Sequence, residues 1–363
     1  DSGGKVGDYS SLALRGDEVH ISYYDQTNGS LKYATNAGGT WVNQTVDVIG
    51  SATKRTSLAI DPEGKVGISY YDSLGDAIKF AELSGGSWRM MHVHATMGGE
   101  SSLRYDTGGN AHIAFDLDDS AQAILMYATD ASWEMTRAAT QNLIAHETSI
   151  DVDLNGFTHI SFYDGSTEDL MYAKNTGGNW QVETVNSTGT VGRYSSLKVD
   201  SSGKAYISYY DSVNGNLRYA TNAGGSWVSY LVDRDNDVGM HSSLAMDRLG
   251  KLHISYYDNT NDDLMYATNA GGTWAKTTVD STGNVGSYSS LALDSDGRPH
   301  IAYSDNSNFD LKYATIGKAG WTATTLDSTG NVGLYASIAV NEKTGKAHIS
   351  YYDATNTNLK YAT

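Results

Sequence analysis

Short runs of apolar and β-branched residues, separated by turn residues, follow one another along the whole chain. The run HISYYD at 253–258 is followed by LMYAT, then by NAGGTW, and then by AKTTVD. None of these runs has the 3.6-residue period of an amphipathic helix, and Gly, Asn and Asp stand between them. The two middle runs are rich in Tyr, Ile and Leu and do not alternate cleanly, which is typical of strands buried on both faces. The pattern predicts units of four short antiparallel strands.

The unit recurs along the chain. Degenerate copies of HISYYD occur eight times, and most neighbouring copies are 47 residues apart. Four-stranded antiparallel units of this length, repeated about an axis, are typical of a β-propeller. We therefore predict an all-β, eight-bladed β-propeller that forms a single domain over residues 1–363. Each copy ends in an Asp, here called the closing acid, and the eight closing acids mark the blades: Asp25, Asp72, Asp116, Asp164, Asp211, Asp258, Asp305 and Asp353.

The order of the runs assigns strand A to the axis of the propeller and strands B, C and D to successive positions outward. Strands A, B and C occur eight times, whereas the Trp-bearing strand D occurs seven times. The last blade should therefore lack its outer strand and leave residues 359–363 as an open edge, which is a template for pairing. Three outcomes stay open. A continuation of the natural chain supplies the strand, a neighbouring subunit donates it in a self-assembly, or the blade stays three-stranded.

The turn before strand D resembles a known motif. ATNAGGTW at 34–41 and 267–274, and ATNAGGSW at 220–227, are similar to the Asp-box S-x-D-x-G-x-T-W, with Asn36 at its Asp position. The chain thus resembles the Asp-box (BNR) sialidase-like β-propellers. The resemblance implies that turn residues such as Asn36, Gly38 and Trp41 pin the third strand to the fourth. It does not extend to the sialidase active site, because the Arg residues are scattered. The seven Trp of this turn are Trp41, Trp88, Trp133, Trp180, Trp227, Trp274 and Trp321.

Composition narrows the classes of function. Forty-two Asp and Glu against 25 Lys and Arg give a net charge of −17, which argues against nucleic acid and anionic membranes as partners. No apolar run is long enough to span a bilayer, so membrane insertion is not expected. Cysteine is absent, which removes disulfides and thiol chemistry. The chain begins without Met or a signal-like stretch, and we interpret it as a mature or excised segment.

A carboxylate stands beside an aromatic ring at the end of strand B in almost every unit. Such a pair can hold a sugar by stacking and by accepting hydrogen bonds from its hydroxyls. The alternative is that the Asp only caps the turn through the backbone, as in an Asx turn. We predict a ring of ligand-binding residues at Tyr24, Asp25, Tyr71, Asp72, Tyr163, Asp164, Tyr210, Asp211, Tyr257, Asp258, Tyr352 and Asp353.

Two departures from the repeat predict local sites. The third unit has extra residues in DLDDSAQAI at 116–124, and HETS follows in the next unit; neutral drift of the repeat is the alternative. The possible unique site consists of Asp116, Asp118, Asp119, His146 and Glu147. DRDNDVG at 233–239 resembles the front of a calcium loop, with Asp233, Asp235 and Asp237 alternating, although it lacks a closing Glu. No cofactor other than this calcium is expected.

Near-identical units favour a non-catalytic binding or adhesion module, secreted or at the cell surface. Its ligand would be carbohydrate or another repetitive surface, with more than one copy bound per chain. Two alternatives come from other classes. One is a glycoside hydrolase or polysaccharide lyase with its site near the third unit. The other is a structural subunit of an extracellular filament or surface assembly.

Overall fold

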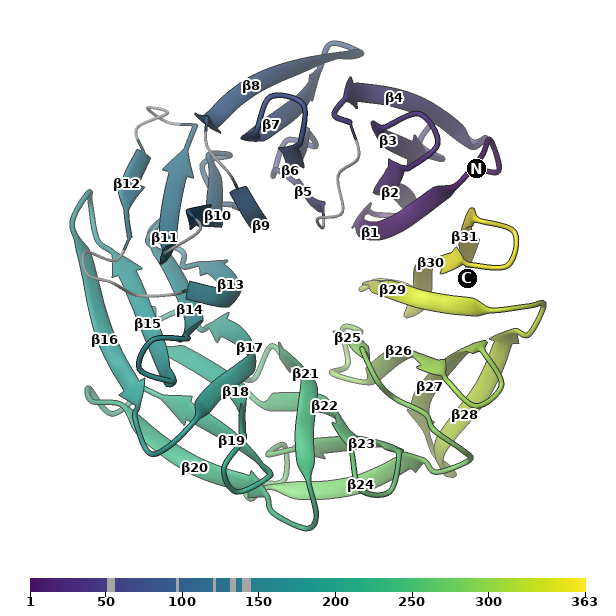
Figure 1. Ribbon diagram of the computed structural model, residues 1–363. Coiled ribbons are helices and arrows are strands. Elements are labelled where there is room, and N and C mark those ends of the chain that lie inside the picture. The colour runs from purple at the N-terminus through teal and green to yellow at the C-terminus, as the bar shows by residue number, and fades with distance from the viewer. Residues whose placement is uncertain (51–55, 96–97, 120–121, 131–134, 139–144) are drawn as a thin grey trace.

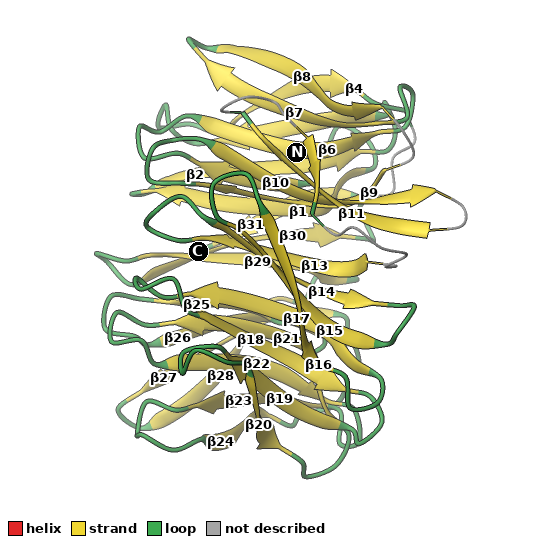
Figure 2. Cartoon of the chain, turned by 90° about the vertical axis from the view of Figure 1, so that its left-hand side faces the viewer, coloured by secondary structure: helices red, strands yellow, loops and turns green. Residues whose placement is uncertain are grey.

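The computed structural model describes the whole chain except residues 51–55, 96–97, 120–121, 131–134 and 139–144. Its strands form eight antiparallel sheets arranged as a ring about one axis (Figure 1). Seen from the side, the connecting loops gather on the two opposite faces of the ring (Figure 2). The predicted eight-bladed β-propeller is confirmed.

The strands follow one another from the axis outward in each blade. The first three blades are β1 (Val6–Arg15), β2 (Glu18–Asp25), β3 (Ser30–Thr35), β4 (Val42–Val48); β5 (Ser57–Ile60), β6 (Val66–Asp72), β7 (Ala77–Ser84), β8 (Ser87–Ala95); and β9 (Gly98–Tyr105), β10 (Ala111–Asp119), β11 (Gln122–Thr129), β12 (Met135–Arg137). The next three are β13 (Ala145–Val152), β14 (Thr158–Asp164), β15 (Asp169–Asn175), β16 (Trp180–Asn186); β17 (Val191–Val199), β18 (Ala205–Asp211), β19 (Asn216–Thr221), β20 (Val228–Asp233); and β21 (Val238–Met246), β22 (Leu252–Asp258), β23 (Asp263–Thr268), β24 (Ala275–Asp280). The last two are β25 (Ser290–Leu293), β26 (Pro299–Asp305), β27 (Asp310–Gly317), β28 (Gly320–Asp327); and β29 (Val332–Asn341), β30 (Lys346–Asp353), β31 (Asn358–Ala362). As predicted, the eighth blade has three strands.

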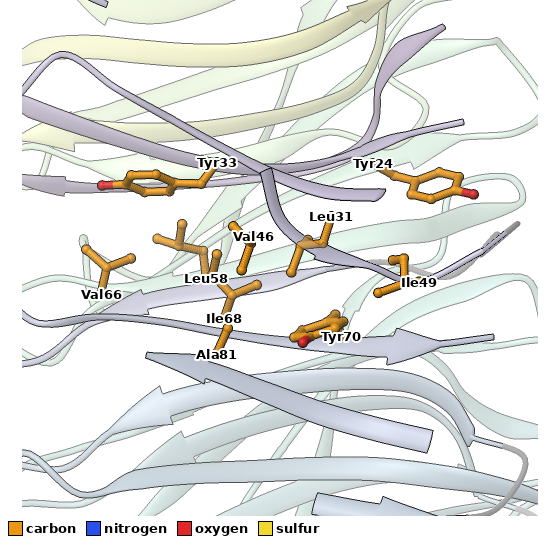
Figure 3. Packing of buried hydrophobic residues seen from close by; sticks show 10 residues of the cluster. All are labelled: Tyr24, Leu31, Tyr33, Val46, Ile49, Leu58, Val66, Ile68, Tyr70 and Ala81. Atoms are coloured by element: carbon orange, nitrogen blue, oxygen red, sulfur yellow. The ribbon is translucent and has the colours of Figure 1, made fainter. Parts of the chain in front are cut away.

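The hydrophobic core lies between neighbouring blades. Each blade packs both of its faces against other blades, so the middle strands are buried on both sides; every residue of β22 is buried, for example. Figure 3 shows the junction of the first two blades, where Leu31 and Val46 of one sheet lie against Ile68 of the next. This two-sided burial explains why the middle strands do not alternate in sequence.

A carboxylate at the end of each of several outer strands ties its blade to the next. Tyr303 of the seventh blade donates a hydrogen bond to Asp280 of the sixth at 2.7 Å, and the Lys312 ammonium lies 2.5 Å from the same carboxylate. Burial would raise the pKa of Asp280, but the bonds from Lys312 and Tyr303 outweigh it, so the pKa is lowered. The same trio recurs as Asp47–Tyr70–Lys79 and Asp327–Tyr351–Lys360.

Six blades carry a buried His at the start of strand B. His159 shows the arrangement: Nδ1 lies 2.5 Å from the Tyr172 hydroxyl, and Nε2 lies 3.3 Å from the Asp153 carboxylate. Burial lowers the pKa of all six imidazoles, and for His159 the pKa falls to about 4. The His–Tyr pairs join strand B to strand C, and the six His are His20, His112, His159, His253, His300 and His348.

We expect the protein to lose stability on mild acidification. An unfolded His binds a proton near pH 6.5, whereas folded His159 stays neutral until about pH 4, so stability falls as the pH drops through this window. At pH 5 the protonation of this one His in the unfolded state lowers the free energy of unfolding by about 2 kcal/mol. Thermal unfolding at pH 7.5 and at pH 5 measures the loss.

The matched variant is His159→Tyr, which copies the fifth blade. There Tyr206 stands at the same position and donates to Asp200 at 3.1 Å. The variant should lose less stability than the wild type between the two pH values. An equal loss in both proteins would show that His159 does not carry the effect.

Candidate ligand site at the channel mouth

A cavity of about 570 Å³ lies on the propeller axis, and all eight blades contribute residues to its lining. The residues come from the beginning of each inner strand, as Tyr9, Glu100 and Ser195 illustrate. Val6 at the start of β1 pairs with Asp25 at the end of β2. The cavity therefore opens on the face that carries the turns after HISYYD, the face on which the sequence predicted binding.

One repeated position supplies the large side chains of the cavity wall. In five blades the inner strand bulges at this position, as the register shift between Asp8 and Ser11 shows for the first, whereas Tyr288 of the seventh blade lies in a turn just before β25. The residue at this position takes a left-handed conformation, with φ between 52° and 55° in six blades. Each such non-glycine residue costs roughly 1 kcal/mol or more, and such strain collects at functional sites. The six residues are Tyr9, Glu147, Tyr194, His241, Tyr288 and Tyr335.

Five of these six side chains are aromatic and form an arc around the mouth. Ring centroids lie 4.5 Å apart for Tyr194 and His241, 3.9 Å for His241 and Tyr288, and 4.7 Å for Tyr9 and Tyr335. Tyr288 is 56% exposed and Tyr335 38% exposed, so both present ring surface to solvent. Exposed aromatic surface gathered on one rim marks a binding site more often than a structural need.

The hydroxyl groups below the arc join the inner end of one blade to the first two strands of the blade before it. Ser242 and Ser208 share a hydrogen bond of 2.8 Å, as do Ser289 and Ser255. Ser243 accepts the backbone N–H of Leu291 at 3.3 Å. The Ser pairs of the inner strands therefore hold the ring together, and they also give the channel a polar wall.

The acids of the mouth lie on blades three and four. Glu100 and Glu147 both line the cavity. Glu147 accepts the backbone N–H of Tyr194 on the next blade. Burial, together with the Glu147 charge, raises the pKa of the Tyr194 phenol. The mouth thus has an aromatic side and an acidic side.

The closing acids predicted to bind ligand are buried in their own turns. Asp25 is 2% exposed and accepts the Asn28 backbone N–H at 2.9 Å and its side chain at 2.8 Å. The neighbouring tyrosines are engaged too; Tyr71 donates to Asp76 at 2.7 Å and Tyr210 to Asp237 at 2.5 Å. Ligand binding by the twelve residues stays a prediction, and the geometry shows their turn-capping role. The same cap is made by Asp72, Asp164, Asp211, Asp258, Asp305 and Asp353.

Of the five residues of the possible unique site, Asp116 and Glu147 have side chains among the described residues. The extra residues lengthen β10 and β11, so the two strands stay paired as far as Asp119 and Gln122. Asp116 therefore lies within a strand, half-buried, and it is not among the described residues that line the mouth. The side chains of Asp118, Asp119 and His146 lie outside the described residues. Of the two described side chains, that of Glu147 lines the cavity, and the unique site stays a prediction.

A lysine occupies the middle of the predicted calcium loop. The Lys276 ammonium contacts the carboxylates of both Asp233 and Asp235. Asp237 points elsewhere and accepts the Asn259 side chain at 2.9 Å. In the described part of the chain no group of three His, Asp or Glu converges as a metal site. Calcium binding here stays a prediction, and the ion would have to displace Lys276.

Sequence reasoning missed the aromatic arc. The signal was the residue just before each Ser pair, which is large and differs from blade to blade: Tyr9, Arg55, Glu100, Glu147, Tyr194, His241, Tyr288 and Tyr335. Arg55 lies outside the described residues. The variation is concentrated at the mouth of the cavity, while the residues around it repeat.

Comparison with known proteins shows the fold. No protein-family model and no curated protein matches the sequence, so the Asp-box resemblance stays a prediction. Among solved structures, an ulvan lyase from a new polysaccharide lyase family matches with a TM-score of 0.56 and 12% identity over 96% of this chain and 90% of that chain. The polysaccharide lyase Uly1 matches with a TM-score of 0.53 and 11% identity over 89% and 90%. A prolyl endopeptidase matches with a TM-score of 0.56 and 10% identity over 96% of this chain and 55% of its own. At this identity the likeness concerns the β-propeller architecture alone.

Proposed function

We propose that the protein is a non-catalytic carbohydrate-binding β-propeller, secreted or displayed at the cell surface, that holds a glycan at the mouth of its central channel. One observation carries the proposal: the aromatic arc at a single repeated position around a cavity of about 570 Å³. A sugar ring stacks its C–H face on a tyrosine and exchanges hydrogen bonds through its hydroxyls. The mouth offers both groups, because Tyr288, Ser289 and Ser290 all line the cavity.

The charge of the site favours neutral or amino sugars. Glu100 and Glu147 stand at the mouth, and the whole chain has a net charge of −17. Both repel a polyanionic glycan and attract a protonated amine. The ulvan lyase with this architecture was solved with a GlcA–Rha3S oligosaccharide, so the architecture is compatible with glycan recognition.

The mouth provides one site per chain. Adhesion to a repetitive surface would then come from several protein copies, or from weaker additional sites on the repeated turns of the same face. Calorimetric stoichiometry separates these cases. A value near one supports the channel mouth, and a value well above one supports the ring of repeated turns that the sequence predicted.

A catalytic function is the second candidate, and one feature of the mouth favours it. Glu147 contacts the Tyr194 backbone, and the Tyr194 ring lies against His241. Carboxylate, phenol and imidazole groups in one cavity are suited to proton transfer, as a glycoside hydrolase or polysaccharide lyase requires. The described part of the chain contains no helix that could cross a membrane, which bears on neither candidate.

We expect Tyr288→Ala to weaken glycan binding about tenfold, because one stacked aromatic contributes roughly 1 kcal/mol and its loss also exposes the sugar face. A glycan array identifies the probe, and calorimetry measures the affinity in calcium and in EDTA. Tyr230→Ala is the matched control, since Tyr230 is also an exposed tyrosine, at 45% against 56% for Tyr288, but lies on the outer strand β20. Equal affinity in both variants and the wild type would exclude the channel mouth.

The variant Glu147→Gln distinguishes binding from catalysis. If the protein is a binding module, the affinity of Glu147→Gln for the glycan should differ from that of the wild type by only a small factor. Both proteins should leave the glycan intact. Chromatography of the oligosaccharide after prolonged incubation tests this. Shorter or unsaturated products from the wild type, lost in Glu147→Gln, would establish the enzyme instead.

A further inference from the structure

The central channel continues below its mouth as a second cavity. This channel cavity has a volume of about 380 Å³, and Ser243 lines both it and the mouth. Its wall is made by residues of the Ser pairs and by the residues that follow them, such as Leu197 and Met246. Arg104 and Lys198 are the charged side chains among the described residues of this wall. The cavity is thus locally cationic in a chain whose net charge is −17.

The two cations stand at one repeated position of the inner strand. Arg104 of β9 pairs with His112, and Lys198 of β17 pairs with Tyr206, at the start of strand B in each blade. Figure 1 shows that β9, β13 and β17 are neighbours around the axis, and β13 carries Asp151 at this position. The other five blades have alanine there, so the fold does not need a charge at this place: Ala13, Ala59, Ala245, Ala292 and Ala339.

The carboxylate of Asp151 is used by the backbone. It accepts the N–H of Val152 at 3.1 Å and the N–H of Val199 on the next blade at 2.9 Å. Among the described contacts, no salt bridge joins Asp151 to Arg104 or to Lys198. The acids two residues further along the same strands cap their own turns, as the bonds that they accept from backbone N–H groups show: Asp106, Asp153 and Asp200. The two cations therefore lack a carboxylate in direct contact.

The positive charge of Lys198 is poorly compensated. Its ammonium makes no hydrogen bond or ion pair with the described residues. Burial among the inner strands lowers the pKa of Lys198, the charge of Asp151 opposes this effect, and the charge of Arg104 adds to it. The guanidinium of Arg104 makes one described hydrogen bond, from Nη1 to the Leu103 carbonyl at 3.0 Å. Cations held in such a place lose hydration without gaining a partner, which favours the entry of an anion.

Hydroxyl groups add further donors to the cavity wall. Ser149, Ser196 and Ser243 each accept a backbone N–H of the next blade, at 3.1, 3.1 and 3.3 Å. All three line the channel cavity, and their own hydroxyl protons have no acceptor among the described contacts. The wall therefore presents an ammonium, a guanidinium and hydroxyl donors, and no carboxylate occurs among its described residues. A guanidinium fork together with such donors suits the oxygens of a phosphate or a sulfate.

We infer that the channel cavity binds one oxyanion, a phosphate or a sulfate group, between Arg104 and Lys198. The anion supplies the counter-charge that Asp151 does not give by contact, and the cavity has room for it together with several waters. The site lies below the glycan proposed at the mouth and rests on different residues, so either proposal can fail without the other. Two sources carry this chemistry, a free ion and a sulfate group of a glycan held at the mouth, and the test separates them.

The first probe is inorganic phosphate, titrated by calorimetry at pH 7.5 and constant ionic strength. The wild type should bind one phosphate per chain. Lys198→Ala, which copies the alanine of the sixth blade, should weaken binding by about tenfold or more, because a charge-assisted hydrogen bond is lost. Asp151→Asn should strengthen binding, because it removes a negative charge near the anion. Lys251→Ala is the matched control; it removes the same charge from the turn between β21 and β22 and should leave the affinity unchanged.

Binding that is absent, or equally strong in Lys198→Ala and the wild type, would overturn the proposal. Displacement of phosphate by an equal concentration of chloride would make the cavity a halide site and overturn the oxyanion.

A measurement on the wild type keeps the test independent of folding defects in the variants. Acetic anhydride reacts with a neutral amine, and a bound anion favours the charged ammonium. Phosphate should therefore slow acetylation of Lys198, followed by mass spectrometry, and leave that of Lys251 unchanged. Equal rates at Lys198 with and without phosphate would count against the site even if phosphate binds.

Glucose 6-sulfate is the second probe and identifies the source of the anion. If it competes with phosphate and Tyr288→Ala weakens this competition, the anion is the sulfate of a glycan held at the mouth. If Tyr288→Ala leaves the competition unchanged, the anion is a free ion. Both results support the site between Arg104 and Lys198, whereas a failure of glucose 6-sulfate and inorganic sulfate alike to compete would overturn the shared oxyanion chemistry.

Discussion

The spacing of several blades depends on one interaction, the carboxylate at the end of an outer strand that is shared by a tyrosine and a lysine of the next blade. The trio around Asp280 fixes how far the sixth and seventh blades lie apart and how they are rotated. Apolar packing between blades supplies most of the stabilisation, but it is not directional. A partly buried ion pair contributes less net energy, because its groups lose hydration, and it specifies geometry instead. With that spacing set, the inner strands meet at the axis, and Ser side chains such as Ser242 and Ser243 bond to the neighbouring blade.

The channel mouth follows from this inner cylinder. Because Ser residues lock the strands just below the mouth, the bulged residue above them can be held in a left-handed conformation that it would otherwise leave. The bulge turns a side chain of an ordinary strand position toward the axis. The repeat thus provides identical scaffolding, while His241 and its equivalents can differ from blade to blade without disturbing the core.

The difference between the repeated scaffold and the variable residues of the mouth also explains what the sequence could predict. Periodic runs and turn residues are local signals, so the number of blades, the order of strands and the three-stranded last blade could all be predicted. The direction of the Tyr288 side chain could not, since the sequence there reads as one regular strand, whereas the structure has a turn before β25 with a left-handed backbone at Tyr288. The closing acids were read as ligands because carboxylate beside tyrosine suits a sugar; the Asx-turn alternative describes how Asp25 is used here. For Asp233 and Asp235, the partner Lys276 lies on a strand some 40 residues away, beyond any local motif.

Ring closure and completion of the last blade are separable in this propeller. In folds that close by sharing a strand between the ends, loss of that strand opens the ring. Here the groups that join the last blade to the first, Asp1 and the Val6 backbone, come after the position of the fourth strand in the repeat. The junction of the last and first blades therefore has its ion pair and its backbone bond with a three-stranded eighth blade, so these contacts, and not a fourth strand, hold the two blades in register.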